Sequence, residues 1–94
     1  MVAAAGVEGV EGLVFLGYPL HPPKQPEKRR DAHLPQIGER MLFVQGERDP
    51  FGGPKELRPI LRKLKNATLL AVKGDHSFPV TEEILDAVAE WISE

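Results

Sequence analysis

The sequence predicts an α/β fold in which a three-stranded parallel sheet has flanking helices. Three short runs are apolar at successive positions, which is typical of strands buried on both faces of a parallel sheet. Each run is closely followed by a glycine, and segments with helical apolar spacing follow the second and third runs. Right-handed crossovers convert the order strand, long loop, strand, helix, strand, helix into a parallel sheet.

The predicted strands are residues 13–16, 41–44 and 67–72. The glycines that follow them are Gly17, Gly46 and Gly74. Open parallel sheets place their ligand chemistry in the loops after the carboxyl ends of the strands. We therefore expect functional residues just after these glycines.

A first helix is predicted over residues 54–64. Its apolar residues lie at positions i, i+3, i+4 and i+7, namely Leu57, Ile60, Leu61 and Leu64. Pro54 suits the first helical position, whereas Pro59 removes an internal hydrogen bond and predicts a kink or an irregular first turn. Asn66 suits a left-handed cap after the helix.

A second helix is predicted over residues 82–92, with Thr81 as its N-cap. Its apolar stripe consists of Ile84, Leu85, Val88, Trp91 and Ile92. Residues 1–5 are predicted to be the last turns of another helix, which Gly6 ends. Residues 18–38 hold five prolines and predict a long loop, with at most a short helical turn near 27–33.

Length and composition restrict the classes of protein that remain. Ninety-four residues allow at most one small domain. The absence of cysteine excludes disulfides, thiolate metal sites and a cysteine nucleophile. A net charge of -2 predicts no nucleic-acid or membrane partner, and the basic run 28–30 is balanced by Glu27 and Asp31. Neither a signal peptide nor a membrane span is recognisable, so a cytoplasmic protein is expected.

An aspartate and a histidine follow two successive predicted strands. Asp49 comes shortly after Gly46, and His76 comes shortly after Gly74. A buried carboxylate can hold an imidazole in one tautomer, so that its other nitrogen takes a proton from a hydroxyl nucleophile. The pair is therefore a candidate for an orienting acid and a general base. The alternative is that Asp49 is a turn residue and His76 a surface histidine beside Asp75.

His21 and Tyr18 are candidates for substrate binding, because both follow the first predicted strand and so lie at the same sheet edge. The alternative is that Tyr18-Pro19 and His21-Pro22-Pro23 fix a rigid extended path. The three histidines are scattered without metal-ligand spacing. We expect neither a metal nor a cofactor.

Three blocks of sequence together resemble the α/β-hydrolase family, and within it the dienelactone-hydrolase-like branch. They are GLVFLGYPLHPP at 12–23, LFVQGERDPFG at 42–52 and GDHSF at 74–78. The resemblance covers about residues 1–91 and implies that the chain is the C-terminal half of the hydrolase fold, with its last three strands. It implies further that Asp49 is the triad acid and His76 the triad base.

The nucleophile of that family is missing. The motif Gly-x-Ser-x-Gly does not occur, and the only serines are Ser77 and Ser93. By resemblance, the chain is expected to begin a few residues after the nucleophile, which removes the oxyanion donors as well.

Two hypotheses about function follow. The first is the C-terminal part of a serine-type hydrolase of esters or thioesters, inactive alone and complemented by a nucleophile-bearing N-terminal half. The second is a non-catalytic module whose exposed sheet edge, the strand at 13–16, pairs with a second copy, as a homo-oligomer, or with another chain. The sequence leaves open whether the chain is an enzyme.

Overall fold

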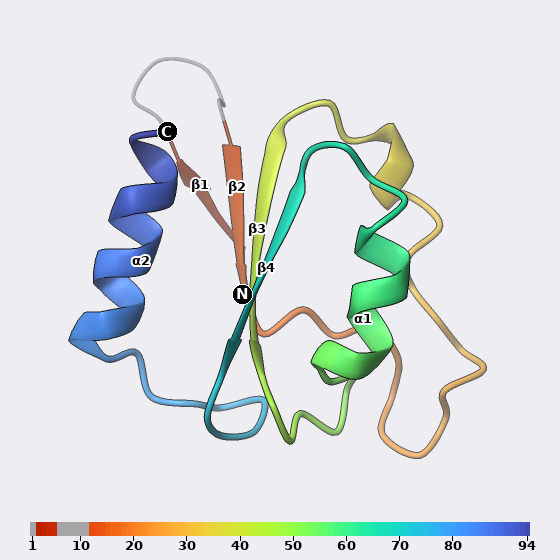
Figure 1. The fold of residues 1–94 in the computed structure, drawn as a ribbon. Helices are drawn as coiled ribbons and strands as arrows, with labels where there is room; N and C mark the ends of the chain where they lie inside the picture. Colours follow the sequence, from red (N-terminus) through yellow and green to blue (C-terminus); the bar gives the residue numbers. More distant parts are fainter. Residues whose placement is uncertain (1, 6–11) are drawn as a thin grey trace.

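The computed structural model describes residues 2–5 and 12–94 of the chain. Its centre is one four-stranded sheet in the order β1-β2-β3-β4. The strands are β1 (Val2–Ala5), β2 (Gly12–Leu16), β3 (Arg40–Gly46) and β4 (Ala67–Val72). Helix α1 (Pro54–Leu61) lies on one side of the sheet and α2 (Glu82–Ile92) on the other (Figure 1).

The predicted parallel arrangement is confirmed for three of the strands. β3 pairs in parallel with β2 on one side and with β4 on the other. Because the three strands run in the same direction, their carboxyl ends lie at the same end of the sheet, which is the lower end in Figure 1. The loops after β2, β3 and β4 therefore come together there, as expected for an α/β fold.

The prediction of a helix at the start of the chain is wrong. Residues Val2–Ala5 form β1, which pairs antiparallel with β2 and aligns Val2 with Phe15. A helix of five residues gains too few internal hydrogen bonds to nucleate, whereas a strand obtains its partners from its neighbour. The expected helix end at Gly6 lies outside the described residues. Since β1 covers β2, the expectation that the strand at 13–16 is a free sheet edge is also wrong.

The successive apolar residues of the strands are explained by burial on both faces. Successive side chains of a strand point to opposite faces. Phe15, Met41 and Phe43 join a core beneath α1, whereas Val14 and Leu42 join a second core beneath α2. In the first core, the rings of Phe15 and Phe43 stack with their centroids 4.6 Å apart. Each helix thus covers its own hydrophobic layer.

Both predicted helices are present. The bounds of α2 agree with the prediction, whereas α1 is shorter than predicted. α2 begins after Thr81, whose hydroxyl accepts a hydrogen bond from the Ile84 backbone N–H at 3.3 Å, as predicted. Its apolar stripe is only partly buried, because Leu85 is 57% exposed and Ile92 46% exposed. α1 ends at Leu61, three residues before the predicted end.

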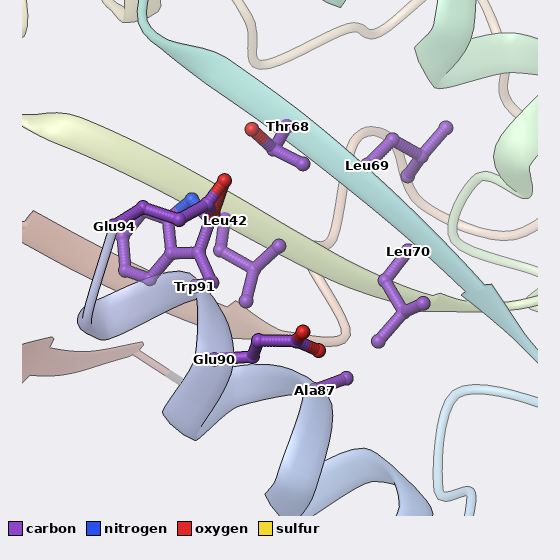
Figure 2. A pocket seen from close by; sticks show the side chains of 8 residues that line it. All are labelled: Leu42, Thr68, Leu69, Leu70, Ala87, Glu90, Trp91 and Glu94. Atoms are coloured by element: carbon purple, nitrogen blue, oxygen red, sulfur yellow. The ribbon is translucent and has the colours of Figure 1, made fainter.

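Trp91 is the main contact of α2 with the sheet. Its ring lies over Leu42 of β3 (Figure 2), and a Cβ added at Gly12 would come within 2.8 Å of it. The Arg40 guanidinium lies 4.4 Å from the ring centroid. A shallow groove of about 300 Å³ runs between this end of α2 and β4. It lies on the α2 side of the sheet.

The loop between β2 and β3 is attached to the sheet at both ends. Its only helical turn is a 3₁₀ segment, Leu34–Gln36, placed after the predicted position. The Asn66 side-chain amide donates hydrogen bonds to the carbonyls of Ile37, at 2.9 Å, and Glu39, at 2.7 Å. The predicted left-handed cap at Asn66 is wrong, since Lys24 is the only described non-glycine residue with a positive φ.

None of the helices in the described ranges combines the length and the hydropathy that crossing a bilayer requires.

Candidate active site

Two glycines let the loops at the carboxyl ends of the strands approach closely. At Gly46, which ends β3, an added Cβ would lie 2.3 Å from the Asp75 carbonyl oxygen. Gly17 adopts φ +79°, and its Cβ would lie 3.3 Å from Nδ1 of His76. Side chains at these positions would separate the loops after β2, β3 and β4. The two glycines therefore bring His76 into the same site as the loop after β3.

Asp49 and His76 form a directly bonded pair. Nδ1 of His76 lies 2.9 Å from Oδ2 of Asp49. The Asp49 side chain is completely buried, whereas the His76 side chain is 31% exposed. Nε2 of His76 has no hydrogen-bond partner among the residues that the structure describes. The arrangement is that of an imidazole held on one side by a carboxylate and open to a reactant on the other.

The backbone of the following turn also holds Asp49. Its Oδ1 accepts a hydrogen bond from the Phe51 backbone N–H at 2.8 Å. The Phe51 ring then packs on the imidazole of His76, with the ring centroids 4.4 Å apart. One short segment, Asp49-Pro50-Phe51, thus contacts both the edge and the face of the histidine.

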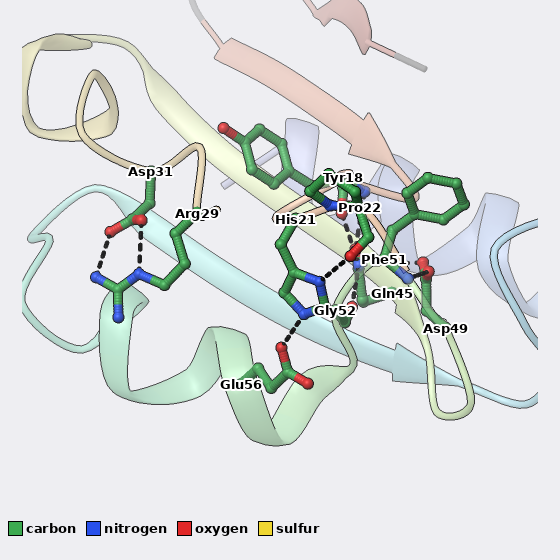
Figure 3. Close-up of polar contacts among 10 residues, drawn as sticks. All are labelled: Tyr18, His21, Pro22, Arg29, Asp31, Gln45, Asp49, Phe51, Gly52 and Glu56. Carbon is green, nitrogen blue, oxygen red and sulfur yellow. Dashed lines mark hydrogen bonds and ion pairs between the residues drawn. The ribbon is translucent and has the colours of Figure 1, made fainter. Parts of the chain in front are cut away.

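Gln45 is a residue of the site that we did not predict from the sequence. Its side chain is completely buried at the end of β3 and donates to Oδ2 of Asp49 at 3.2 Å (Figure 3). The sequence does contain an indication of this role, because Gln45 is a polar residue that continues an apolar run in a central strand. Buried amides nearly always have hydrogen-bond partners, so such a residue indicates a polar group nearby.

A small groove lies beside His76. It has a volume of about 260 Å³ and is lined by Leu16, Phe78 and Val80 together with His76 and Ser77. Ser77 follows His76 in the chain, and its backbone N–H donates to Oδ1 of Asp75 at 2.9 Å. The surface next to the imidazole is therefore mainly apolar.

His21 lies at the other end of the site and is buried, with an exposed fraction of 4%. Its Nδ1 donates to the Pro22 carbonyl at 2.8 Å, and its Nε2 bonds the Glu56 carboxylate of α1 (Figure 3). The Pro22 carbonyl and then the Glu56 carboxylate raise the pKa of His21, against the opposing effect of burial. Both ring nitrogens face acceptors of this same chain.

Tyr18 is buried beside His21. Its hydroxyl bonds the Arg30 carbonyl and lies 3.3 Å from Nε2 of His33. Burial, and then the negative charge of Asp31, raises the pKa of the phenol. The structure thus joins Asp49 and His76 directly, and it places Tyr18 and His21 in contacts with the loop and with α1.

Within the described ranges, no group of three or more His, Cys, Asp or Glu side chains is arranged to hold a metal ion.

Comparison with known proteins agrees with this architecture. No solved structure matches the chain. The family model described as "Alpha/beta hydrolase domain" matches residues 1–91, almost the entire sequence. Together with the three parallel strands and their two helices, this match shows that the chain belongs to the α/β-hydrolase domain family.

Proposed function

We propose that this chain supplies the acid and the base of a serine-type hydrolase site that cleaves esters or thioesters. In this proposal Asp49 is the acid, His76 is the general base, and the nucleophilic serine comes from outside these 94 residues. The observation that supports it most directly is the 2.9 Å bond between Nδ1 of His76 and a fully buried carboxylate, while Nε2 has no hydrogen-bond partner among the described residues.

The proposed reaction proceeds through proton transfers to and from His76. The Nε2 lone pair of His76 accepts the proton of the serine hydroxyl while the serine oxygen attacks the acyl carbon. The imidazolium that forms is stabilised by Asp49 and then protonates the leaving alcohol or thiol. Water repeats the sequence on the acyl-enzyme and releases the acid. The apolar groove at Leu16, Phe78 and Val80 suits an uncharged substrate group next to the base.

Neither serine of the chain is suited to be the nucleophile. Ser77 follows the base directly, and Ser93 caps the end of α2, where its hydroxyl donates to the Glu90 carbonyl at 2.9 Å. A nucleophile elbow needs a sharp turn between a strand and a helix, and neither serine lies in one. The proposal therefore includes inactivity of the 94-residue chain by itself.

The test uses a fluorophosphonate probe, which reacts with activated serines. The gene is tagged at its 3′ end in the native organism, and the tagged species and its bound partners are isolated, weighed intact and treated with the probe. We expect a labelled serine outside residues 1–94. We expect the label to be lost in His76→Ala and in Asp49→Ala and retained in His33→Ala, the matched control.

Two results would contradict the proposal. One is labelling that persists in His76→Ala. The other is hydrolysis of an activated ester by the purified 94-residue chain at a rate that falls in His76→Ala, because that would show a complete site within the chain.

A further inference from the structure

We propose that Gln45 is a positioning residue, whose buried amide fixes the Asp49 carboxylate and so keeps neutral His76 in the tautomer with its proton on Nδ1. The catalytic meaning of this inference rests on the proposed function, whereas the tautomer itself can be measured in the chain alone.

The chemistry of its neighbours determines which way the Gln45 amide faces. The Tyr18 backbone N–H can only donate, and it lies 2.9 Å from Oε1. The carbonyl oxygens of Tyr18, at 2.9 Å, and Gly52, at 2.6 Å, can only accept, and both lie next to Nε2. A flipped amide would place donor against donor and acceptor against acceptor. The nitrogen must therefore be the atom that faces Asp49.

These contacts also make the amide rigid. Gln45 bonds both backbone groups of Tyr18, as a neighbouring strand would, and so joins the loop after β2 to the end of β3. Its bond to Gly52 joins the turn after Asp49 to the same point. With no exposed surface, the side chain has no solvent to compete for these partners. The two N–H groups are shared among three acceptors, namely the carbonyls of Tyr18 and Gly52 and Oδ2 of Asp49, so the nitrogen that faces Asp49 is held in place.

The surroundings of Asp49 then determine where the shared proton resides. Phe51 donates to Oδ1, and both Gln45 and His76 face Oδ2. The Phe51 N–H and the Gln45 amide nitrogen can only donate, so both require the Asp49 carboxylate as an acceptor. The carboxylate then presents Nδ1 of His76 with an acceptor as well, which favours the proton on Nδ1. The lone pair of neutral His76 is then at Nε2.

The experiment reads the tautomer of His76 by ¹⁵N NMR at a pH where the ring is neutral. Gln45→Glu keeps the oxygen that faces the Tyr18 N–H and replaces the donor at Asp49 with an oxygen. Gln45→Met keeps a similar side-chain volume and removes every hydrogen bond of the Gln45 side chain. Asn66→Asp is the matched control, because Asn66 is an amide that bridges two carbonyls at residues 37 and 39.

In the unmodified chain we expect widely separated Nδ1 and Nε2 resonances, typical of one tautomer. In both Gln45 variants the two resonances are expected to converge as the tautomers exchange, whereas Asn66→Asp leaves them separated. A folded Gln45→Met chain with the wild-type separation would overturn the inference.

A second measurement applies if neither Gln45 variant folds. In the unmodified chain, the side-chain ¹⁵N resonance of Gln45 should shift with the titration of His76, while that of Asn66 stays constant. A Gln45 resonance that ignores the titration would overturn the inference. Failure of the fluorophosphonate test would leave both NMR results unaffected, so the two proposals fail separately.

Discussion

The described part of the chain contains two histidine–carboxylate pairs, which differ in what their ring nitrogens contact. In the first pair, His76 bonds the fully buried Asp49 through Nδ1 and leaves Nε2 without a partner among the described residues. In the second, His21 is buried, both nitrogens are bonded, and the carboxylate of Glu56 is 49% exposed. Pairing with a carboxylate therefore does not by itself leave a ring nitrogen available to a reactant. A free nitrogen and a buried, fully bonded carboxylate distinguish the first pair.

The largest expected effect comes from removing the buried carboxylate. Asp49→Ala leaves the N–H groups of Phe51 and His76 without their acceptor, and it removes one of the three acceptors that face the Gln45 amide nitrogen. We expect the free energy of unfolding to fall by about 3–5 kcal/mol, as for a buried charged pair that loses one partner. Urea denaturation measures it. Glu56→Ala is the matched change in the other pair, and its half-exposed carboxylate is expected to contribute at most about 1 kcal/mol. If Asp49→Ala and Glu56→Ala lowered the free energy of unfolding equally, the two pairs would not differ in the way described.

The next effect tests the contact between Gly17 and His76. Gly17→Ala places a Cβ in a left-handed conformation and 3.3 Å from Nδ1 of His76. We expect a loss of about 1–2 kcal/mol from the backbone alone, together with a displaced His76 resonance in NMR spectra. Gly38→Ala is the control, since its Cβ would meet no atom within 4 Å. A Gly17→Ala chain as stable as the control would show that Gly17 and His76 are farther apart in solution.

A smaller effect concerns pH and the second pair. The pKa of His21 is raised in the folded chain, so its contribution to stability is complete below the ordinary value of 6.5. That contribution is lost as the pH rises through the raised folded value. Urea unfolding at several pH values above 6.5 should show the decline in the unmodified chain and a shallower decline in Glu56→Gln. Identical slopes would mean that Glu56 does not hold the proton on His21.

The smallest effect is expected at the third histidine. His33 is exposed, and its only polar side-chain contact among the described residues is the 3.3 Å approach to the Tyr18 hydroxyl. We expect His33→Ala to change the free energy of unfolding by less than about 0.5 kcal/mol, as thermal denaturation can show. A larger loss would indicate that His33 holds the loop after β2.

The sequence predicted the parts of the fold that depend on local pattern. Runs of apolar residues identified β2, β3 and β4, and Thr81 identified the start of α2. Strand direction placed Asp49 and His76 at one edge of the sheet, although only the structure shows their side chains in contact.

The parts that were missed depend on contacts distant in sequence. β1 exists through its pairing with β2, which periodicity over five residues does not reveal. The role of Gln45 depends on Tyr18, which is 27 residues away. The bond between His21 and Glu56 spans 35 residues.

β1 has a consequence for any assembly that enlarges the sheet. It occupies the hydrogen-bonding edge of β2 along residues 12–15, in the direction opposite to the other strands. A further parallel strand can pair directly with β2 only after β1 has left. Such an assembly is a strand-exchange reaction, in which the pairing of four residues must first be broken.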